Sequence, residues 1–474
     1  MIVGRKAEQK RLKDLLKSKQ SEFAAVYGRR RVGKTFLIRE TFKYKFTFHH
    51  TGLSGAGMPE QLSEFCKSLK EQGLERFAAP RTWRDAFHLL EKLLAASSDK
   101  KKVVFIDEMP WLDTPKSNFV RALEHFWNAW ASARTDIVLI VCGSATSWII
   151  NKLINNYGGL HNRITKQIYL NQFNLKECEE YSKSRKLAFT RQQVVEAYMV
   201  LGGVPYYWSL LEQGTSLSEN IDRLFFTPKG ELTNEFGVLY RSLFRNPEPH
   251  IAIIKALSSH KSGLARDSIL EETGLYDNAT FVRALTELEQ SDFVRKFNYI
   301  GNKAKNAVYQ LVDNFTLFYY AFMEANGDSN PHFWSASINT PAYNTWTGLA
   351  FERVCLLHVE QIKRALGFNA VISSVHSWFY RPPKNAKDAQ GVQIDLLINR
   401  SDDVINLCEM KYCKGKYRLT EDEFYKLENR RQTFIEQTHT RKSVVLTMIT
   451  TNGILPGNFA NEIQNQIVVN QLFE

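Results

Sequence analysis

One eight-residue segment constrains this chain more than any other part of its sequence. Residues 28–35 read GRRRVGKT and match the pattern GxxxxGK[ST] at every required position. The segment follows a short apolar run, FAAVY, and opens a helix-like stretch, TFLIRETF. Between a strand and a helix, the glycines let backbone N–H groups curl around phosphate oxygens, and the helix N-terminus adds its dipole. The sequence therefore predicts a phosphate-binding loop here.

Each residue type in this loop has a chemical reason to be there. The Lys34 ammonium can neutralise the β- and γ-phosphates of a nucleoside triphosphate, and the Thr35 hydroxyl can ligate Mg²⁺. A glycine-rich turn with a chance lysine is the alternative, but it does not account for the strand and helix in this order. The residues expected to contact the nucleotide are Gly28, Arg29, Arg30, Arg31, Val32, Gly33, Lys34, Thr35 and Phe36.

Two carboxylates follow a second apolar run. Residues 103–106 read VVFI, and Asp107 and Glu108 come directly after them. The carboxyl edge of an α/β sheet is where such folds place their ligand chemistry. We expect Asp107 to hold Mg²⁺, directly or through water, and Glu108 to orient or activate the attacking water. A solvent-exposed strand end is the alternative for such a pair in isolation.

Two further polar residues are candidates for a role in hydrolysis. Ser144 follows the apolar run at residues 137–142 and is placed to sense the γ-phosphate, although a helix cap or turn serine is an equal alternative. Arg163 lies after this strand and is a candidate arginine finger supplied to a neighbouring subunit of a homo-oligomer. A surface arginine is the alternative reading of Arg163.

The motifs together resemble a known family. The start VGRKAE at residues 3–8, the loop YGRRRVGKT, FIDE, CGS and LGGVP at residues 201–205 resemble the prokaryotic AAA-type ATPases sometimes called the archaeal ATPase family. The resemblance covers roughly residues 1–240. It implies ATP and Mg²⁺ as cofactors, ATP hydrolysis as the activity, and an adenine pocket bordered by Val3, Gly4 and Arg5.

The pattern along the chain predicts an α/β fold with four parts. Strand-like and helix-like segments alternate over residues 1–170, which is typical of a parallel sheet with helices on both faces. Strands are expected at residues 23–27, 45–49, 103–106 and 137–142. The remaining parts are a helical lid at 171–245, a winged helix with a helical connector at 246–325, and a last α/β unit at 335–474 with strands near 371–380, 392–399 and 404–410.

The third part has two open interpretations. Three short helices and a hairpin turning at residues 301–303 form the winged-helix pattern, which can bind DNA or a protein partner. The expected recognition helix at 279–290 carries Arg283 but also Glu287 and Glu289, a poor face for phosphate. The wing offers Lys303 and Lys305.

The last unit carries a possible second site. Strand alternation predicts that Ile394, Leu396 and Ile398 share one face and that Asp395 points the other way. Glu409 and Lys411 are two apart on the next strand. Asp395 and Glu409 would hold Mg²⁺ or Mn²⁺, with Lys411 beside a water and Glu352 as a further carboxylate.

This pattern resembles the PD-(D/E)xK nuclease superfamily, with Gln393 and Asp395 in place of its Pro-Asp pair. The resemblance spans about residues 340–415 and implies a restriction-endonuclease-like fold. A solvated charged strand edge is the alternative. Two functions follow: an ATPase that couples turnover to DNA binding or metal-dependent cleavage, or an ATP-switched regulator that binds DNA or protein and cuts nothing.

Charge and cysteine content set the remaining expectations. The formal net charge is +12, and residues 1–50 hold fourteen basic against four acidic residues, so the excess accompanies the phosphate loop rather than the last unit. The six cysteines form no CxxC pair, which favours reduced thiols in a cytoplasmic protein. The absence of a signal-like start or a long apolar run predicts a soluble chain without a membrane partner.

Overall fold

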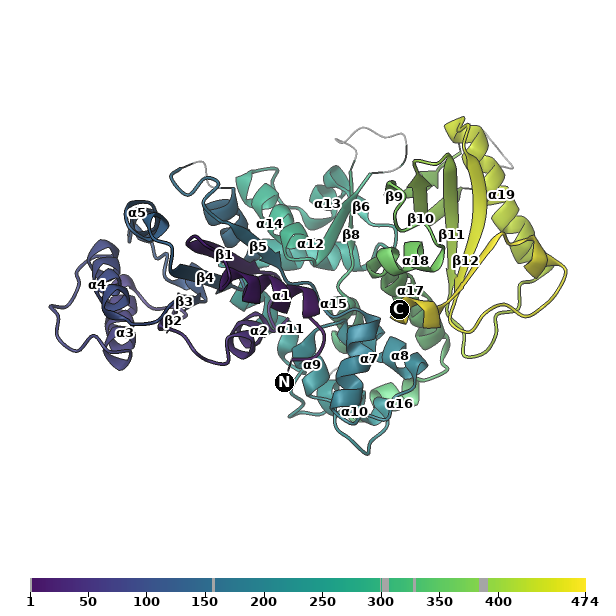
Figure 1. Cartoon of the computed structure of the whole chain (residues 1–474). Coiled ribbons are helices and arrows are strands. Elements are labelled where there is room, and N and C mark those ends of the chain that lie inside the picture. Colours follow the sequence, from purple (N-terminus) through teal and green to yellow (C-terminus); the bar gives the residue numbers. More distant parts are fainter. Residues whose placement is uncertain (1, 156–157, 299, 301–306, 327–329, 383–390) are drawn as a thin grey trace. The chain divides into compact units, whose positions relative to one another are not determined.

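The computed structural model describes residues 2–155, 158–298, 300, 307–326, 330–382 and 391–474 (Figure 1). The chain forms two compact units, Met1–Gln172 and Phe173–Glu474. The first unit holds the phosphate loop and both carboxylates that follow the second apolar run. The first unit also holds the candidates near the N-terminus, Ser144 and Arg163, and the second unit holds Glu352, Asp395, Glu409 and Lys411. The finer four-part division of the chain stays a prediction.

A five-stranded parallel sheet forms the centre of the first unit, in the order β2-β3-β4-β1-β5. Its strands are β1 (Glu22–Tyr27), β2 (Phe48–Thr51), β3 (Lys102–Asp107), β4 (Ile137–Gly143) and β5 (Lys166–Tyr169). Its helices are α1 (Lys6–Leu15), α2 (Lys34–Thr41), α3 (Met58–Glu71), α4 (Trp83–Ala96), α5 (Phe119–Ala129) and α6 (Thr146–Trp148). The expected α/β architecture of this region is confirmed.

Strand alternation divides the interior of this unit into two cores. Phe23 and Ala25 of β1 pack with residues of α3, α4 and α5, whereas Ala24 and Val26 pack with residues of α1 and α2. Successive side chains of a strand point to opposite faces, so a continuous apolar run such as FAAVY suits a strand covered on both sides.

Two strands differ from the sequence prediction. The strand expected at residues 45–49 runs instead from Phe48 to Thr51. Strand β5 was not expected, because its sequence KQIY is short and largely polar. It lies at the sheet edge, pairs with β1 alone, and has its first two residues exposed, so burial leaves little trace in its composition.

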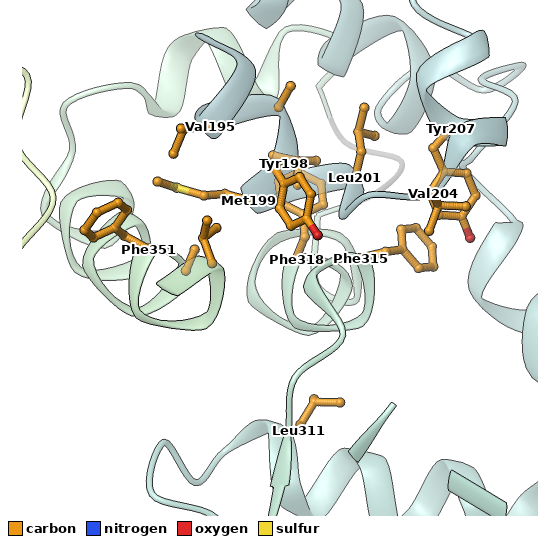
Figure 2. Packing of buried hydrophobic residues seen from close by; sticks show 14 of the residues in the cluster. Val195, Tyr198, Met199, Leu201, Val204, Tyr207, Leu311, Phe315, Phe318 and Phe351 are labelled. Carbon is orange, nitrogen blue, oxygen red and sulfur yellow. The ribbon is translucent and has the colours of Figure 1, made fainter. Parts of the chain in front are cut away.

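The second unit begins with helices that share one core with later elements. They are α7 (Leu175–Ser184), α8 (Arg191–Leu201), α9 (Pro205–Ser209), α10 (Leu217–Phe225) and α11 (Glu235–Leu243). Figure 2 shows Tyr198 and Met199 of α8 beside Phe315, Phe318 and Phe351. The helical segment is therefore packed on the connector and on the first long helix of the C-terminal region.

Three helices and a small antiparallel sheet follow. They are α12 (Glu248–Ser258), α13 (Arg266–Thr273) and α14 (Ala279–Gln290), with strands β6 (Leu264–Ala265), β7 (Val294–Phe297) and β8 (Val308–Leu311) in the order β6-β8-β7. This is the element order of the expected winged helix. Lys303, Lys305 and the turn at residues 301–303 lie outside the described residues.

The connector leads into a mixed five-stranded sheet. The helices are α15 (Asn314–Phe318), α16 (Phe333–Ser337), α17 (Pro341–Leu357), α18 (Val359–Ala365) and α19 (Glu421–Thr438). The strands are β9 (Ser373–Tyr380), β10 (Val392–Arg400), β11 (Val404–Lys411), β12 (Ser443–Thr450) and β13 (Asn465–Val468). The order is β13-β12-β11-β10-β9, with antiparallel pairs among β9–β11 and parallel pairs among β11–β13.

An irregularity in β10 corrects one expectation. Leu396 and Ile398 pack in the core that contains α17, but Ile394 packs with Leu397 in the core that contains α19. The prediction that Ile394, Leu396 and Ile398 share a face is therefore wrong. The pairing of β10 with β9 shifts register between Ile394 and Leu397, and such a bulge breaks the two-residue period on which the prediction rested.

Candidate functional site

The phosphate loop connects β1 to α2 and is built around backbone that favours glycine. Gly28 has φ +139°, and a Cβ there would lie 2.4 Å from the carbonyl oxygen of Leu170. Gly33, the residue before α2, has φ +87°. Both glycines therefore permit a turn that a larger side chain would strain or block.

Lys34 closes this loop from inside. Its Nζ donates hydrogen bonds to the carbonyl oxygens of Gly28 and Arg29, each at 2.8 Å. The side chain is buried, and burial lowers the pKa of the ammonium, while Cys142, Glu108 and Asp107 act in the opposite direction. A buried cation held by neutral carbonyls is well placed to exchange them for an anion.

Thr35 and Asp107 form a pair of oxygen ligands beside the lysine. The Thr35 hydroxyl lies 3.1 Å from Asp107 Oδ1, and Asp107 is buried at the end of β3. The backbone N–H of Glu108 donates to the same Oδ1 at 3.0 Å. A hydroxyl and a carboxylate are hard donors of the kind that Mg²⁺ prefers, so these residues fit the metal that the sequence implied.

Sequence reasoning missed one partner of Asp107. The Cys142 thiol donates to Asp107 Oδ1 at 2.6 Å from the neighbouring strand β4. Burial raises the pKa of this thiol well above its usual value, and the negative charge of Asp107 acts in the same direction. The available signal was the position of Cys142 near the end of the strand that pairs with β3.

Glu108 is held by the residue predicted to sense the γ-phosphate. Glu108 has φ +45°, a left-handed conformation that is uncommon for a residue with a Cβ. Its carboxylate accepts hydrogen bonds from the Ser144 backbone N–H at 3.2 Å and from the Ser144 hydroxyl at 3.0 Å. Ser144 therefore contacts the expected catalytic carboxylate, and its contact with phosphate stays a prediction.

The other expected nucleotide residues vary in exposure. Arg29 and Val32 are buried in the loop, whereas Phe36 is 48% exposed on α2. Near the N-terminus, Gly4 has φ +63°, and Arg5 donates from Nη2 to the Asn171 carbonyl oxygen at 2.5 Å. The hydrogen bond from Arg5 to Asn171 holds the start of the chain against the end of the first unit.

The other residues predicted to contact the nucleotide or to act in hydrolysis are Val3, Arg30, Arg31 and Arg163. Val3 precedes Gly4, and Arg30 and Arg31 lie within the loop. Arg163 is exposed in a turn before β5, so any contact with a nucleotide held by another copy stays a prediction.

In the second unit, two of the four C-terminal candidates, Glu352 and Asp395, lie beside the same lysine, Lys261. Lys261 Nζ lies 3.0 Å from Glu352 Oε1 and 3.8 Å from Asp395 Oδ2. Asp395 also accepts from the Gln393 side-chain amide at 2.5 Å. Burial, and after it the negative charge of Asp395, raise the pKa of Glu352 to about 7 against the opposing effect of Lys261.

The other two candidates have different partners. Glu409 accepts from Lys411 and from Arg430 of α19, each at 2.8 Å. The neighbours of Glu409 on β11, Cys408 and Met410, pack in the core with α17, so Glu409 points toward the opposite face. Among the described residues, no group of three or more His, Cys, Asp or Glu side chains is arranged to hold a metal ion. The structure does not bring the four candidates together.

In α14, the helix expected to contact DNA, one acidic side chain is hydrogen-bonded to a neighbouring helix. Glu287 accepts a hydrogen bond from the ring of His250 on α12 at 2.8 Å. This contact ties α14 to α12 and leaves the DNA-binding interpretation of α14 as a prediction.

Comparison with known proteins finds a family match in the first part of the chain. Residues 2–211 match the family described as an ATPase domain predominantly from Archaea. The chain is 22% identical over 418 residues to an uncharacterized protein of Methanocaldococcus jannaschii, MJECL04, covering 87% of this chain and 88% of that protein.

Two solved structures are similar at low identity. The Walker-type ATPase paby2304 of Pyrococcus abyssi has a TM-score of 0.49 at 19% identity, covering 67% of this chain and 95% of that one. The ORC2 protein of Aeropyrum pernix has a TM-score of 0.39 at 13% identity, covering 75% and 95%. Within the described residues, the helices lack the combined length and hydropathy needed to span a bilayer.

Proposed function

We propose that this chain, whose residues 2–211 match an ATPase domain family found predominantly in Archaea, is an ATPase that binds ATP at residues 28–35 and hydrolyses it. The observation that carries the proposal is the convergence of Lys34, Thr35, Asp107 and Glu108 at one edge of the parallel sheet. A fold of this type binds its ligands at the carboxyl ends of its strands.

The contacts of these residues suggest how each would act. Lys34 would leave the carbonyl oxygens of Gly28 and Arg29 and pair with the β- and γ-phosphate oxygens. Thr35 and Asp107 would hold Mg²⁺, which neutralises phosphate charge when bound. Glu108 would orient the attacking water and accept its proton, held in position by Ser144.

Replacement of Lys34 by alanine tests this proposal. We expect Lys34→Ala to abolish ATP-dependent phosphate release, because no other ammonium is held inside the loop among the described residues. Lys45→Ala, at an exposed position after α2, is the matched control and should retain the wild-type rate. Equal phosphate release by Lys34→Ala and wild type would reject the ATPase assignment.

We further propose that the C-terminal region acts as a regulator and does not cut nucleic acid. Two observations support this choice. Lys261 is already paired with Glu352 and Asp395, and Glu409 is paired with Lys411 and Arg430 on the other face of the sheet. A two-carboxylate metal mechanism requires these groups to converge on one ion.

Incubation with DNA tests the choice between regulator and nuclease. The protein, DNA and Mg²⁺ or Mn²⁺ are combined with and without ATP, and fragments are followed on a gel. We expect no cleavage. A regulator should instead show DNA or protein binding that changes when ATP is added. Cleavage that is lost in Glu409→Ala plus Lys411→Ala would overturn the regulator proposal and restore the nuclease one.

A further inference from the structure

A cavity of about 290 Å³ lies within the second unit, apart from every candidate residue of the ATPase domain. Its walls come from the end of α12 and the turn after it, from α15 and the helical turn Tyr319–Met323, and from α17. The volume is at the lower end of the range for small-molecule sites in proteins. We call it the Arg353 cavity.

Arg353 lines this cavity and carries unused hydrogen-bonding capacity. The residue is 3% exposed. Its Nη2 donates to the Lys261 carbonyl oxygen at 2.7 Å, but Nε and Nη1 have no hydrogen-bond partner among the residues that the structure describes. A buried guanidinium with two unsatisfied nitrogens is costly, because each lost its water without gaining an acceptor.

A second buried side chain on the wall is also incompletely bonded. Asn314 is 2% exposed and donates from Nδ2 to the Tyr198 carbonyl oxygen at 2.7 Å. Its Oδ1 has no partner within the described part of the chain. The lining therefore offers a bound molecule donors at Arg353 and an acceptor at Asn314.

The charges around the cavity favour an anion. Lys261 is paired with Glu352 and Asp395, and Lys255 lies 2.8 Å from Glu324. In the described ranges, Arg353 alone among these cations has no carboxylate oxygen within ion-pairing distance. An incoming anion would therefore meet a guanidinium that no protein acid has neutralised by direct contact.

Another part of the lining is apolar. It includes the ring of Trp346 and the side chains of Leu257, Leu317 and Ala350, all on the helices that form the cavity. An inorganic ion alone would leave this surface without contact, whereas a small organic group would cover it. The ligand that suits both parts of the lining has an anionic end and an apolar or aromatic end.

We propose that the Arg353 cavity binds a small phosphate ester, with the phosphate paired to Arg353 and the organic group against Trp346. A phosphate group has several oxygens that can accept in parallel from the two unbonded nitrogens of Arg353, whereas Lys255 and Lys261 are already paired with carboxylates. This site is independent of the nucleotide loop and adds a ligand-binding function to the second unit.

Calorimetric titration of the full chain with phenyl phosphate and with inorganic phosphate tests this proposal. We expect both to bind, phenyl phosphate more tightly, because only the ester reaches the apolar wall. Arg353→Met should weaken phenyl phosphate binding at least about tenfold, the equivalent of one lost charge-assisted hydrogen bond. The same titrations in the Lys34→Ala background should still show the phenyl phosphate site that Arg353→Met weakens, which separates this site from any phosphate bound at the loop.

Two further variants keep the test informative if Arg353→Met does not fold. Ser259→Asp places a negative charge at the exposed rim of the cavity without removing a packed group, and it should weaken binding severalfold. Arg364→Met removes an exposed arginine of α18 and should change nothing. Absence of binding, or binding equal in wild type and both cavity variants, would overturn the proposal, and equal affinity for the two probes would overturn the role of Trp346.

Discussion

At the scale of single residues, the proposed ATPase site is a set of mutual hydrogen bonds. Lys34 is bonded to its own loop, Thr35 and Cys142 to Asp107, and Ser144 to Glu108. The bonds hold each group near its expected working position before substrate arrives, which lowers the cost of organising them during the reaction.

Ser144 is expected to affect turnover more than nucleotide binding. In Ser144→Ala, Glu108 loses its hydroxyl donor and keeps only the backbone N–H. We expect kcat for ATP to fall about tenfold with little change in KM, because a misoriented base slows the chemical step. Steady-state phosphate release gives both parameters, and Ser132→Ala, at an exposed position, is the control. A raised KM with unchanged kcat would instead indicate direct contact with nucleotide.

Cys142 is expected to be chemically inert despite its place beside Asp107, the proposed metal ligand. Burial and Asp107 both raise the pKa of the thiol, and the thiolate is the form that reacts. Mass spectrometry after iodoacetamide treatment of the folded protein should therefore find Cys142 unmodified. Cys413, which is partly exposed, should be alkylated under the same conditions. Early modification of Cys142 would show that the loop opens in solution.

At the scale of elements, His358 connects the junction of α17 and α18 to the start of α7. It lies between α17 and α18, and its Nε2 accepts a hydrogen bond from the backbone N–H of Leu175 at the start of α7. The ring also lies 2.7 Å, through Nδ1, from the carbonyl oxygen of Val354. The neutral ring, with its proton on Nδ1, satisfies both contacts.

Acid is therefore expected to weaken the second unit. Burial lowers the pKa of His358 to about 4, below its usual 6.5. The unfolded chain binds the proton first as pH falls, so stability is present above about 6.5 and is lost progressively toward 4, by up to about 3 kcal/mol. Urea unfolding of wild type and His358→Gln at pH 7 and pH 5 isolates this loss, because the raised pKa of Glu352 changes stability in the opposite direction over the same range. His358→Gln should reduce the pH dependence, whereas His332→Gln, at an exposed position, should not.

The sequence predicted the elements better than the directions of their side chains. Buried strands such as β3 and β4 were foreseen because their runs are continuously apolar, and the phosphate loop because its glycines mark required backbone angles. Asp395 and Glu409 were expected to converge, but the bulge in β10 and the partner Arg430 on α19 depend on tertiary packing. Neither the bulge nor the contact with Arg430 can be predicted from the local sequence pattern.

At the scale of the whole molecule, the open question is whether copies of the chain complete one another's sites. Arg163 is exposed on the first unit and is the residue we propose to act across subunits. An arginine supplied in trans stabilises the charge that develops during hydrolysis and commonly raises the rate by orders of magnitude.

A mixing experiment tests this arrangement. Arg163→Ala and Lys34→Ala are expected to be inactive alone, the first for lack of the arginine and the second for lack of nucleotide contact. Their mixture should recover part of the wild-type phosphate release, because one variant supplies the loop and the other the arginine. Recovery should increase with protein concentration. Arg163→Ala with wild-type activity, or a mixture no more active than its components, would exclude the proposal.

The ammonium of Lys261 between Glu352 and Asp395 has a practical consequence. It is a cation covalently attached to the chain, so neither dialysis nor a chelator can remove it. Treatment with EDTA should therefore stop ATP hydrolysis while leaving the melting temperature of the second unit unchanged. The two units would thus differ in their need for a metal ion: the first requires dissolved Mg²⁺ for hydrolysis, whereas the positive charge beside Glu352 and Asp395 in the second is part of the chain.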